Sequence, residues 1–325
     1  MDRRAFISKV GGSVLALPVA VEAQQAGKVP RVGLLTAGVS QDRIDAFREG
    51  LRQLGYLEDQ NIVIEIRSSE GKSERLPSLA IELVKLNVSV IVASSSDTTR
   101  AAQDITKTIP IVMALSGDPV GAGFAASLPR PGGNITGFTT LVAGLYTKRL
   151  QLMREAVPKL RRVAALWRQE NPSHRAIVKE IEKAASSLGL QVHLAEVRNP
   201  GELQQAFSAI TKARVGAFLV PGDNMFDVVK GQLLDLASRN QLPAMYAAKT
   251  YVEAGGLMSS AADQNDLFHR AAGYVDRILK GAKPGDLPIQ QPTKFEFFIN
   301  LKTAKALGLT IPRTVVLQAD QVIDP

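Results

Sequence analysis

The sequence predicts an α/β protein built from two doubly wound, Rossmann-like lobes. Short segments that are apolar throughout alternate with segments whose apolar residues recur at helical spacing, and this alternation is typical of parallel sheets covered by helices on both faces. The order of segments in the first half begins again at Arg162. With 325 residues, the chain is long enough for two cores of ordinary domain size. Two such units in one chain predict a cleft between them.

The first half of the chain contains five predicted strands with helices between them. The first helical stripe includes Phe47 and Leu51 and is stopped by Gly55. A second helix is expected at 76–84 and a third at 99–106. The apolar runs around these helices predict strands at 32–35, 61–66, 88–93, 109–115 and 134–139.

The second half repeats this order and adds a tail. Strands are predicted at 163–167, 190–197, 215–220, 242–247 and 257–260, and helices at 177–188, 202–212 and 228–237. In the tail we expect a helix at 264–279, a strand at 295–299, a short helix at 301–307 and a last strand at 315–317. The tail is too short for a domain and too apolar for a linker, so we expect it to pack onto both lobes.

The amino-terminal segment is typical of a secretory signal peptide. Arg3, Arg4 and Lys9 precede an uncharged apolar stretch at 10–21, and small residues precede an expected cut near Ala23. The apolar stretch is short for a bilayer span; an amino-terminal anchor or an ordinary helix is the alternative. The paired arginines, followed by Phe and Lys, also resemble a twin-arginine export signal. We therefore expect a cleaved leader and a periplasmic protein.

Composition and sequence motifs argue against several classes of function. The formal net charge is +8, but the lysines and arginines are scattered without aromatic interleaving, so we expect no nucleic-acid partner. The chain has no cysteine, which excludes disulfides, thiolate metal sites and a cysteine nucleophile. His174, His193 and His269 have no partner at metal-ligand spacing, so we expect no metal. No dinucleotide fingerprint, phosphate loop or nucleophile elbow occurs, so we expect no cofactor and no catalytic residue, although carboxylates alone can do acid–base chemistry.

Polar side chains follow the strands of the first predicted sheet, where ligands bind in folds of this class. These candidate ligand-binding residues are Thr36, Ser40, Ser94, Ser95, Ser96, Thr98, Ser116 and Asp118. The run 94–98 leads into a helix, and hydroxyls with free N–H groups at a helix start suit a carboxylate. An N-cap without a ligand is the alternative. Asp118 is a candidate partner for an ammonium group, or a turn former.

The second predicted sheet offers further candidates at the corresponding edge. These residues are Trp167, Asp223, Asn224, Tyr246 and Lys249. Trp167 and Tyr246 are candidates to stack on an apolar ligand body, or else to belong to the core. Asp223 is a second candidate to pair with an ammonium group. The sequence therefore predicts binding groups on both sides of the cleft.

Several ordered segments resemble a known family. They are GLRQLGY at 50–56, GDPV at 117–120, SLPRPGGNITG at 127–137, VEAGGLMS at 252–259, QPTKFE at 291–296 and NLKTAKALGL at 300–309. Together they resemble the exported substrate-binding proteins of ABC importers that are related to the tryptophan and tyrosine binders. The resemblance covers essentially the whole chain after the leader.

The resemblance implies the type I periplasmic-binding-protein fold, in which two doubly wound lobes are joined by three crossings and close on a ligand. It places residues 30–140 with about 262–292 in the first lobe, and residues 141–261 with about 293–325 in the second, after a signal peptide at 1–25. The implied partners are a small-molecule ligand and a membrane permease, and we expect a monomer.

Two departures from the family pattern bear on the ligand. Relatives commonly carry Gly where Ser95 or Ser96 stands, and an aromatic residue where Ser260 stands. We therefore expect an amino acid or another small carboxylate with an apolar body, rather than tryptophan in particular. Two other functions stay open: a sensory module that reports ligand to a membrane kinase, and an exported Rossmann-type enzyme.

Overall fold

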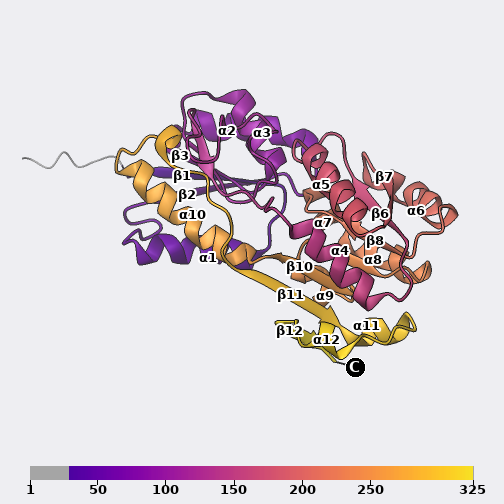
Figure 1. Cartoon of the computed structure of the whole chain (residues 1–325). Helices are drawn as coiled ribbons and strands as arrows, with labels where there is room; N and C mark the ends of the chain where they lie inside the picture. Colours follow the sequence, from indigo (N-terminus) through magenta and orange to yellow (C-terminus); the bar gives the residue numbers. More distant parts are fainter. Residues whose placement is uncertain (1–28, 325) are drawn as a thin grey trace, which may run out of the picture.

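A computed structural model describes residues 29–324, so the signal peptide expected at 1–25 lies outside the described residues. The chain folds into two α/β lobes, each with its own sheet, as Figure 1 shows. The first sheet has five strands in the order β2-β1-β3-β4-β5, and the second has seven in the order β12-β11-β10-β9-β8-β6-β7. Within the described residues, no helix is both long and apolar enough to span a bilayer.

The first lobe is a parallel sheet covered on both faces. Its elements are β1 (Arg31–Thr36), α1 (Gln41–Gln53), β2 (Val63–Ser68), η1 (Ser73–Arg75), α2 (Leu76–Lys85), β3 (Val90–Ala93), α3 (Ser96–Ile105), β4 (Ile111–Met113) and β5 (Ile135–Gly137). Helices α1 and α10 (Gln264–Leu279) pack together on one face, where Phe47 and Phe268 are buried. Helices α2 and α3 cover the other face through Leu83 and Ala102.

The second lobe repeats this plan and extends it with the tail. Its elements are α4 (Leu145–Ala156), β6 (Arg162–Trp167), α5 (His174–Ser187), β7 (Gln191–Glu196), η2 (Pro200–Glu202), α6 (Leu203–Lys212), β8 (Ala217–Val220), α7 (Asn224–Val228), α8 (Lys230–Arg239), β9 (Ala244–Tyr246), α9 (Lys249–Glu253), β10 (Met258–Ala262), β11 (Phe295–Asn300), α11 (Leu301–Ala306), α12 (Arg313–Val316) and β12 (Gln321–Ile323). Strand β11 pairs antiparallel with β10, whereas the other pairs in this sheet are parallel.

The chain passes between the two sheets three times. It leaves the first sheet after β5 and enters α4, whose Leu150 and Met153 lie in the core of the second lobe. It returns after β10 into α10, which packs against α1. The last passage follows η3 (Pro284–Asp286) and Ile289, which is buried in the first lobe, and leads into β11. Hinges between lobes consist of a few residues in loops or at the ends of elements, and the three connections are of this kind.

The predicted last strand at 315–317 is wrong. Residues Arg313–Val316 form α12, and the last strand is β12 at Gln321–Ile323, which pairs with β11. The β-branched pair Val315-Val316 suggested a strand, but Pro312 at the N-cap position starts a helical turn that buries Val315 against the second lobe. The helix expected at 228–237 is also interrupted, at Val229, and forms α7 and α8.

Candidate functional site

A cavity of about 100 Å³ lies between the lobes, where strands of both sheets end. The first lobe contributes the loops after β3 and β4, and the second contributes α4 and the loops after β6 and β8. The polar and charged side chains that line the cavity are Arg43, Ser94, Ser95, Ser96, Thr140, Arg149, Asn171, Ser173, Asp223, Asn224, Asp227 and Gln264. The carboxyl ends of parallel strands are where ligands bind in doubly wound sheets.

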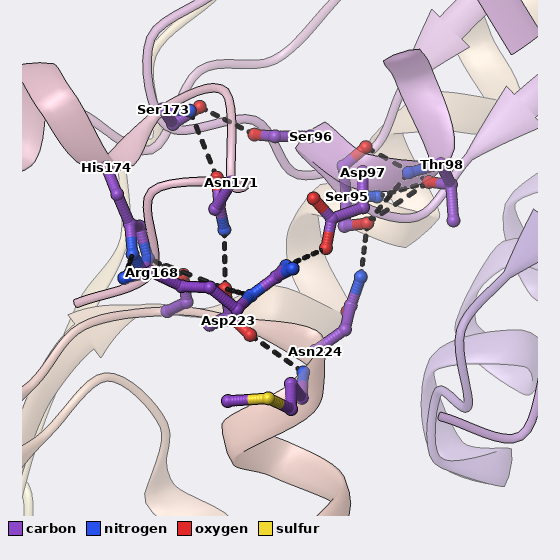
Figure 2. Close-up of polar contacts among 12 residues, drawn as sticks. Ser95, Ser96, Asp97, Thr98, Arg168, Asn171, Ser173, His174, Asp223 and Asn224 are labelled. Atoms are coloured by element: carbon purple, nitrogen blue, oxygen red, sulfur yellow. Dashed lines mark hydrogen bonds and ion pairs between the residues drawn. The ribbon is translucent and has the colours of Figure 1, made fainter. Parts of the chain in front are cut away.

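The start of α3 is held by a capping box. The Ser95 hydroxyl accepts a hydrogen bond from the Thr98 N–H at 3.3 Å, and the Thr98 hydroxyl accepts one from the Ser95 N–H at 2.9 Å. The helix therefore begins at Ser96 rather than at Thr99, where the sequence predicted its start. The capping box leaves the Ser96 hydroxyl free to reach the other lobe (Figure 2).

Four polar contacts join the lobes at this point. Ser96 Oγ lies 2.6 Å from Ser173 Oγ, which also accepts a hydrogen bond from the Asp118 N–H at 3.0 Å. The Asn224 amide donates to Ser95 Oγ. Arg168 of the second lobe forms a buried ion pair with Asp97 of the first (Figure 2). The structure is therefore a closed arrangement of the two lobes.

The Arg168 guanidinium bridges two carboxylates of unequal acidity. Its Nε donates to Asp223 Oδ2 at 3.0 Å, and Asn171 Nδ2 donates to the same oxygen at 2.7 Å. Burial acts to raise the pKa of Asp223, but the charge of Arg168 and the hydrogen bonds from Arg168 and Asn171 hold it below its usual value. Burial, with the nearby charge of Asp223, raises the pKa of Asp97 to about 7. Asp97 is therefore the member of this cluster that takes up a proton near neutral pH.

His174 orders the loop that carries Arg168. Its Nδ1 accepts a hydrogen bond from the Arg168 N–H at 2.8 Å, and its Nε2 lies 3.2 Å from the Gly222 carbonyl oxygen. Burial lowers the pKa of His174, so the imidazole is neutral and its Nε2–H donates to Gly222. His174 thus holds the backbone of two loops of the second lobe in place, at Arg168 after β6 and at Gly222 after β8. Its own side chain does not line the cavity.

The structure places five of the thirteen predicted site residues in the cavity wall. They are Ser94, Ser95, Ser96, Asp223 and Asn224. Three more, namely Thr98, Ser116 and Asp118, lie directly behind this wall: Thr98 closes the capping box, Ser116 Oγ is 3.4 Å from Ser96 Oγ, and Asp118 accepts from the Gly121 N–H at 2.9 Å.

The other five predicted residues lie away from the cavity wall. Thr36 accepts hydrogen bonds from the Gly38 and Val39 N–H groups within its own turn. Ser40 and Lys249 line a smaller neighbouring cavity of about 60 Å³, where Lys249 Nζ lies 3.4 Å from Glu296 Oε2. Tyr246 is buried in the core of the second lobe and stacks on Tyr251, with ring centres 4.7 Å apart. Trp167, at the end of β6, does not line the cavity.

Seven charged or polar residues of the cavity wall were not predicted from the sequence. They are Arg43, Thr140, Arg149, Asn171, Ser173, Asp227 and Gln264. Arg149 had a detectable signal, because it sits among Leu150, Leu152 and Met153 on a helix whose buried side it shares. Arg43 lies in the first turn of α1 and Asp227 in the short helix α7 of the other lobe, and they come near each other only when the lobes meet, which no local pattern reveals. Within residues 29–324, no cluster of three or more metal-binding side chains occurs.

The two lobes, their three connections and the polar cavity between them define a bilobed solute-binding protein. The family model described as ABC transporter substrate binding protein matches residues 36–323, so the chain belongs to this family. A tyrosine-binding protein of Clostridioides difficile strain R20291 is 27% identical over 263 residues, which are 81% of this chain and 75% of that protein.

Solved structures show the same fold. The ABC domain in complex with L-Trp from Streptococcus pneumoniae is 28% identical, and the match covers 91% of this chain and 100% of that one with a TM-score of 0.85. A conserved domain protein from Vibrio cholerae is 27% identical with the same coverage and a TM-score of 0.84. The fold of this chain is that of the type I periplasmic binding proteins, as predicted.

Proposed function

We propose that this protein is the solute-binding receptor of an ABC importer and that it closes its lobes over a small organic ligand, an amino acid or another carboxylate with an apolar body. The observation that carries the proposal is the cavity between the lobes, whose hydrogen-bonding side chains come from both lobes at the strand ends. A ligand held there contacts both lobes only when they are closed, so its binding favours the closed state.

The contacts between the lobes support a closing motion. Ser96–Ser173, Ser95–Asn224 and Asp97–Arg168 are all side-chain contacts across the gap, which a hinge motion can break without disturbing either sheet. The cavity of about 100 Å³ is smaller than the cavity of about 150 Å³ that encloses benzene in an engineered protein. An amino acid or aromatic acid therefore fits between the lobes only if they part from the arrangement described here.

The relatives support the choice of ligand class. One is described as a tyrosine-binding protein, and one solved structure is a complex with L-Trp. The family resemblance implies two departures in this chain, a serine at 95 or 96 in place of glycine and Ser260 in place of an aromatic residue, so we expect the side chain of its ligand to differ from that of tryptophan. We propose binding without turnover, a monomer, and no nucleic-acid partner.

Family membership also supports export. We propose that the leader carries the protein to the periplasm by the twin-arginine route, that it is cut near Ala23, and that the closed form is read by a membrane permease. Folding before export suits a receptor without disulfides, and the sequence has no cysteine.

A ligand screen tests this function. The protein lacking residues 1–25 is heated with each of the twenty amino acids and with aromatic and aliphatic carboxylates, and candidate ligands are titrated by calorimetry. We expect a few related compounds to raise the melting temperature, because only the folded protein binds them, and to bind one per chain unchanged. A panel without any such compound, or a ligand converted to a product, would contradict the proposal.

A further inference from the structure

Three arginines are buried around the cleft, and they differ in their counter-ions. Arg168 lies between Asp97 and Asp223. Arg43 is close enough to Asp227 of the other lobe for that charge to raise its pKa against the effect of burial. Arg149, which is 4% exposed, has no acidic partner among residues 29–324.

The surroundings of Arg149 orient its guanidinium but do not neutralise it. Its Nε donates to the Ser260 carbonyl oxygen at 2.7 Å, and its Cζ lies 5.0 Å from the centre of the Tyr146 ring. Burial lowers the pKa of Arg149, yet a guanidinium stays protonated in proteins. A buried cation without a counter-ion is strongly unfavourable, so this position is suited to an anion that arrives from outside.

Two further polar atoms of the cavity wall also lack partners. In the described part of the chain, four buried side-chain oxygens make no hydrogen bond, and Ser94 Oγ and Gln264 Oε1 are two of them. Both residues line the same cavity as Arg149, and Ser94 is only 1% exposed. By contrast, Ser95, Ser96 and Asp223 in the same wall are all hydrogen-bonded.

We propose that Arg149 is the anchor for a carboxylate of the ligand, with the Ser94 hydroxyl as a second donor from the opposite lobe and Gln264 Oε1 as the acceptor for a donor group on the ligand. This assignment rests on the proposed function and specifies the group that the receptor recognises. A guanidinium edge fits a carboxylate in a planar, charge-assisted arrangement. The unsatisfied Gln264 oxygen selects acids that carry an ammonium or hydroxyl group.

The position of this anchor couples recognition to closure. Arg149 lies on the first turns of α4, just after the first crossing, and its Nε is bonded to Ser260 in β10, just before the second crossing. Ser94 directly follows β3 in the other lobe. A carboxylate held by both residues therefore joins the two lobes directly beside their connections.

Matched acids and carboxamides test the anchor on the wild-type protein. Calorimetry is carried out with L-tyrosine and L-tyrosinamide, L-leucine and L-leucinamide, and benzoate and benzamide. We expect an acid of this panel to bind and its amide to bind on the order of 100-fold more weakly, because the amide leaves Arg149 unpaired. An amide that binds as tightly as its acid overturns the anchor while leaving a receptor in place, and a panel in which no acid binds overturns it as well.

Two variants in α4 provide a second test of the anchor. Arg149→Gln is expected to weaken the acid on the order of 100-fold while leaving the weak amide unchanged. Arg154→Gln on the same helix removes an exposed guanidinium and is the control, with unchanged affinity. Equal affinity of Arg149→Gln and wild type for the acid overturns the proposal. If Arg149→Gln does not fold, the comparison of acid with amide on the wild-type protein still shows whether the carboxylate is recognised.

Discussion

Gly117 of the first lobe lies directly against Ser173 of the second: a methyl group on Gly117 would come within 2.5 Å of Ser173 Cβ and 2.9 Å of its Oγ. The close approach of the loop after β4 and the start of α5 therefore requires a residue without a side chain at this position. The contact exists only while the lobes are closed, so it reports on closure rather than on the folding of either lobe.

Gly117→Ala is expected to hold the lobes apart and to weaken ligand binding at least tenfold, since a loss of about 1.4 kcal/mol is a factor of ten. The melting temperature of the ligand-free protein should change little, because each lobe keeps its own core. Gly133→Ala, where an added methyl group meets nothing within 4 Å, is the control. Calorimetry with the ligand found in the screen measures both, and unchanged affinity in Gly117→Ala would show that closure is not needed for binding.

Ser173→Ala is expected to weaken ligand binding by a factor of several, since each hydrogen bond contributes about 1 kcal/mol. The variant loses the contacts of Ser173 Oγ with Ser96 Oγ and with the Asp118 N–H. Ser173 makes no side-chain cap to α5, so the helix itself should persist. Ser187→Ala at the other end of α5 is the control, and equal affinities of the two variants would argue against a latch at Ser173.

Asp97 is expected to make the stability of the closed protein depend on pH. Burial raises its pKa from 3.8 to about 7, so the native state binds more protons than the unfolded state between these values. The stabilisation contributed by the protonated Asp97 is therefore fully present below pH 4 and is lost as the pH rises to about 7. Above that pH, the titration of Asp97 no longer changes the free energy of unfolding.

Denaturant unfolding of wild type and Asp97→Asn at pH 5, 6, 7 and 8 isolates this contribution. We expect the difference in unfolding free energy between the two proteins to fall with rising pH, because asparagine does not titrate. Asp104→Asn, an exposed residue on the same helix, should keep the slope of the wild type. A difference that is constant over this range would mean that Asp97 is ionised throughout and that Arg168 outweighs the effect of burial.

The fold could be predicted well because its signals are local. The residues that make β3 a buried strand and α10 an amphipathic helix are neighbours in the sequence. The helix predicted at 264–279 is confirmed at Gln264–Leu279. The error at 315–317 arose where local propensity competed with tertiary packing, since Val315 is buried by α12 rather than by a strand.

The candidate site was only partly predictable because it forms between segments far apart in the chain. Ser94, Ser95 and Ser96 were found, since polar residues after an apolar strand mark a sheet edge. The sequence did not reveal that Asp223 forms an ion pair with Arg168, or that the Tyr246 side chain is buried in the core of the second lobe. The first outcome depends on a partner 55 residues away in the chain. The second depends on which face of the sheet the last side chain of β9 points to.

Measuring the distance between the lobes in solution tests most directly whether they close over the ligand. Because the chain has no cysteine, Lys107→Cys and Lys212→Cys, two exposed positions on different lobes, allow specific labelling for single-molecule fluorescence transfer. We predict two populations without ligand and a shift toward one of them as the screened ligand is added, with a midpoint equal to its calorimetric dissociation constant. A distribution that stays unchanged at ligand concentrations that saturate binding would contradict closure of the two lobes over the ligand.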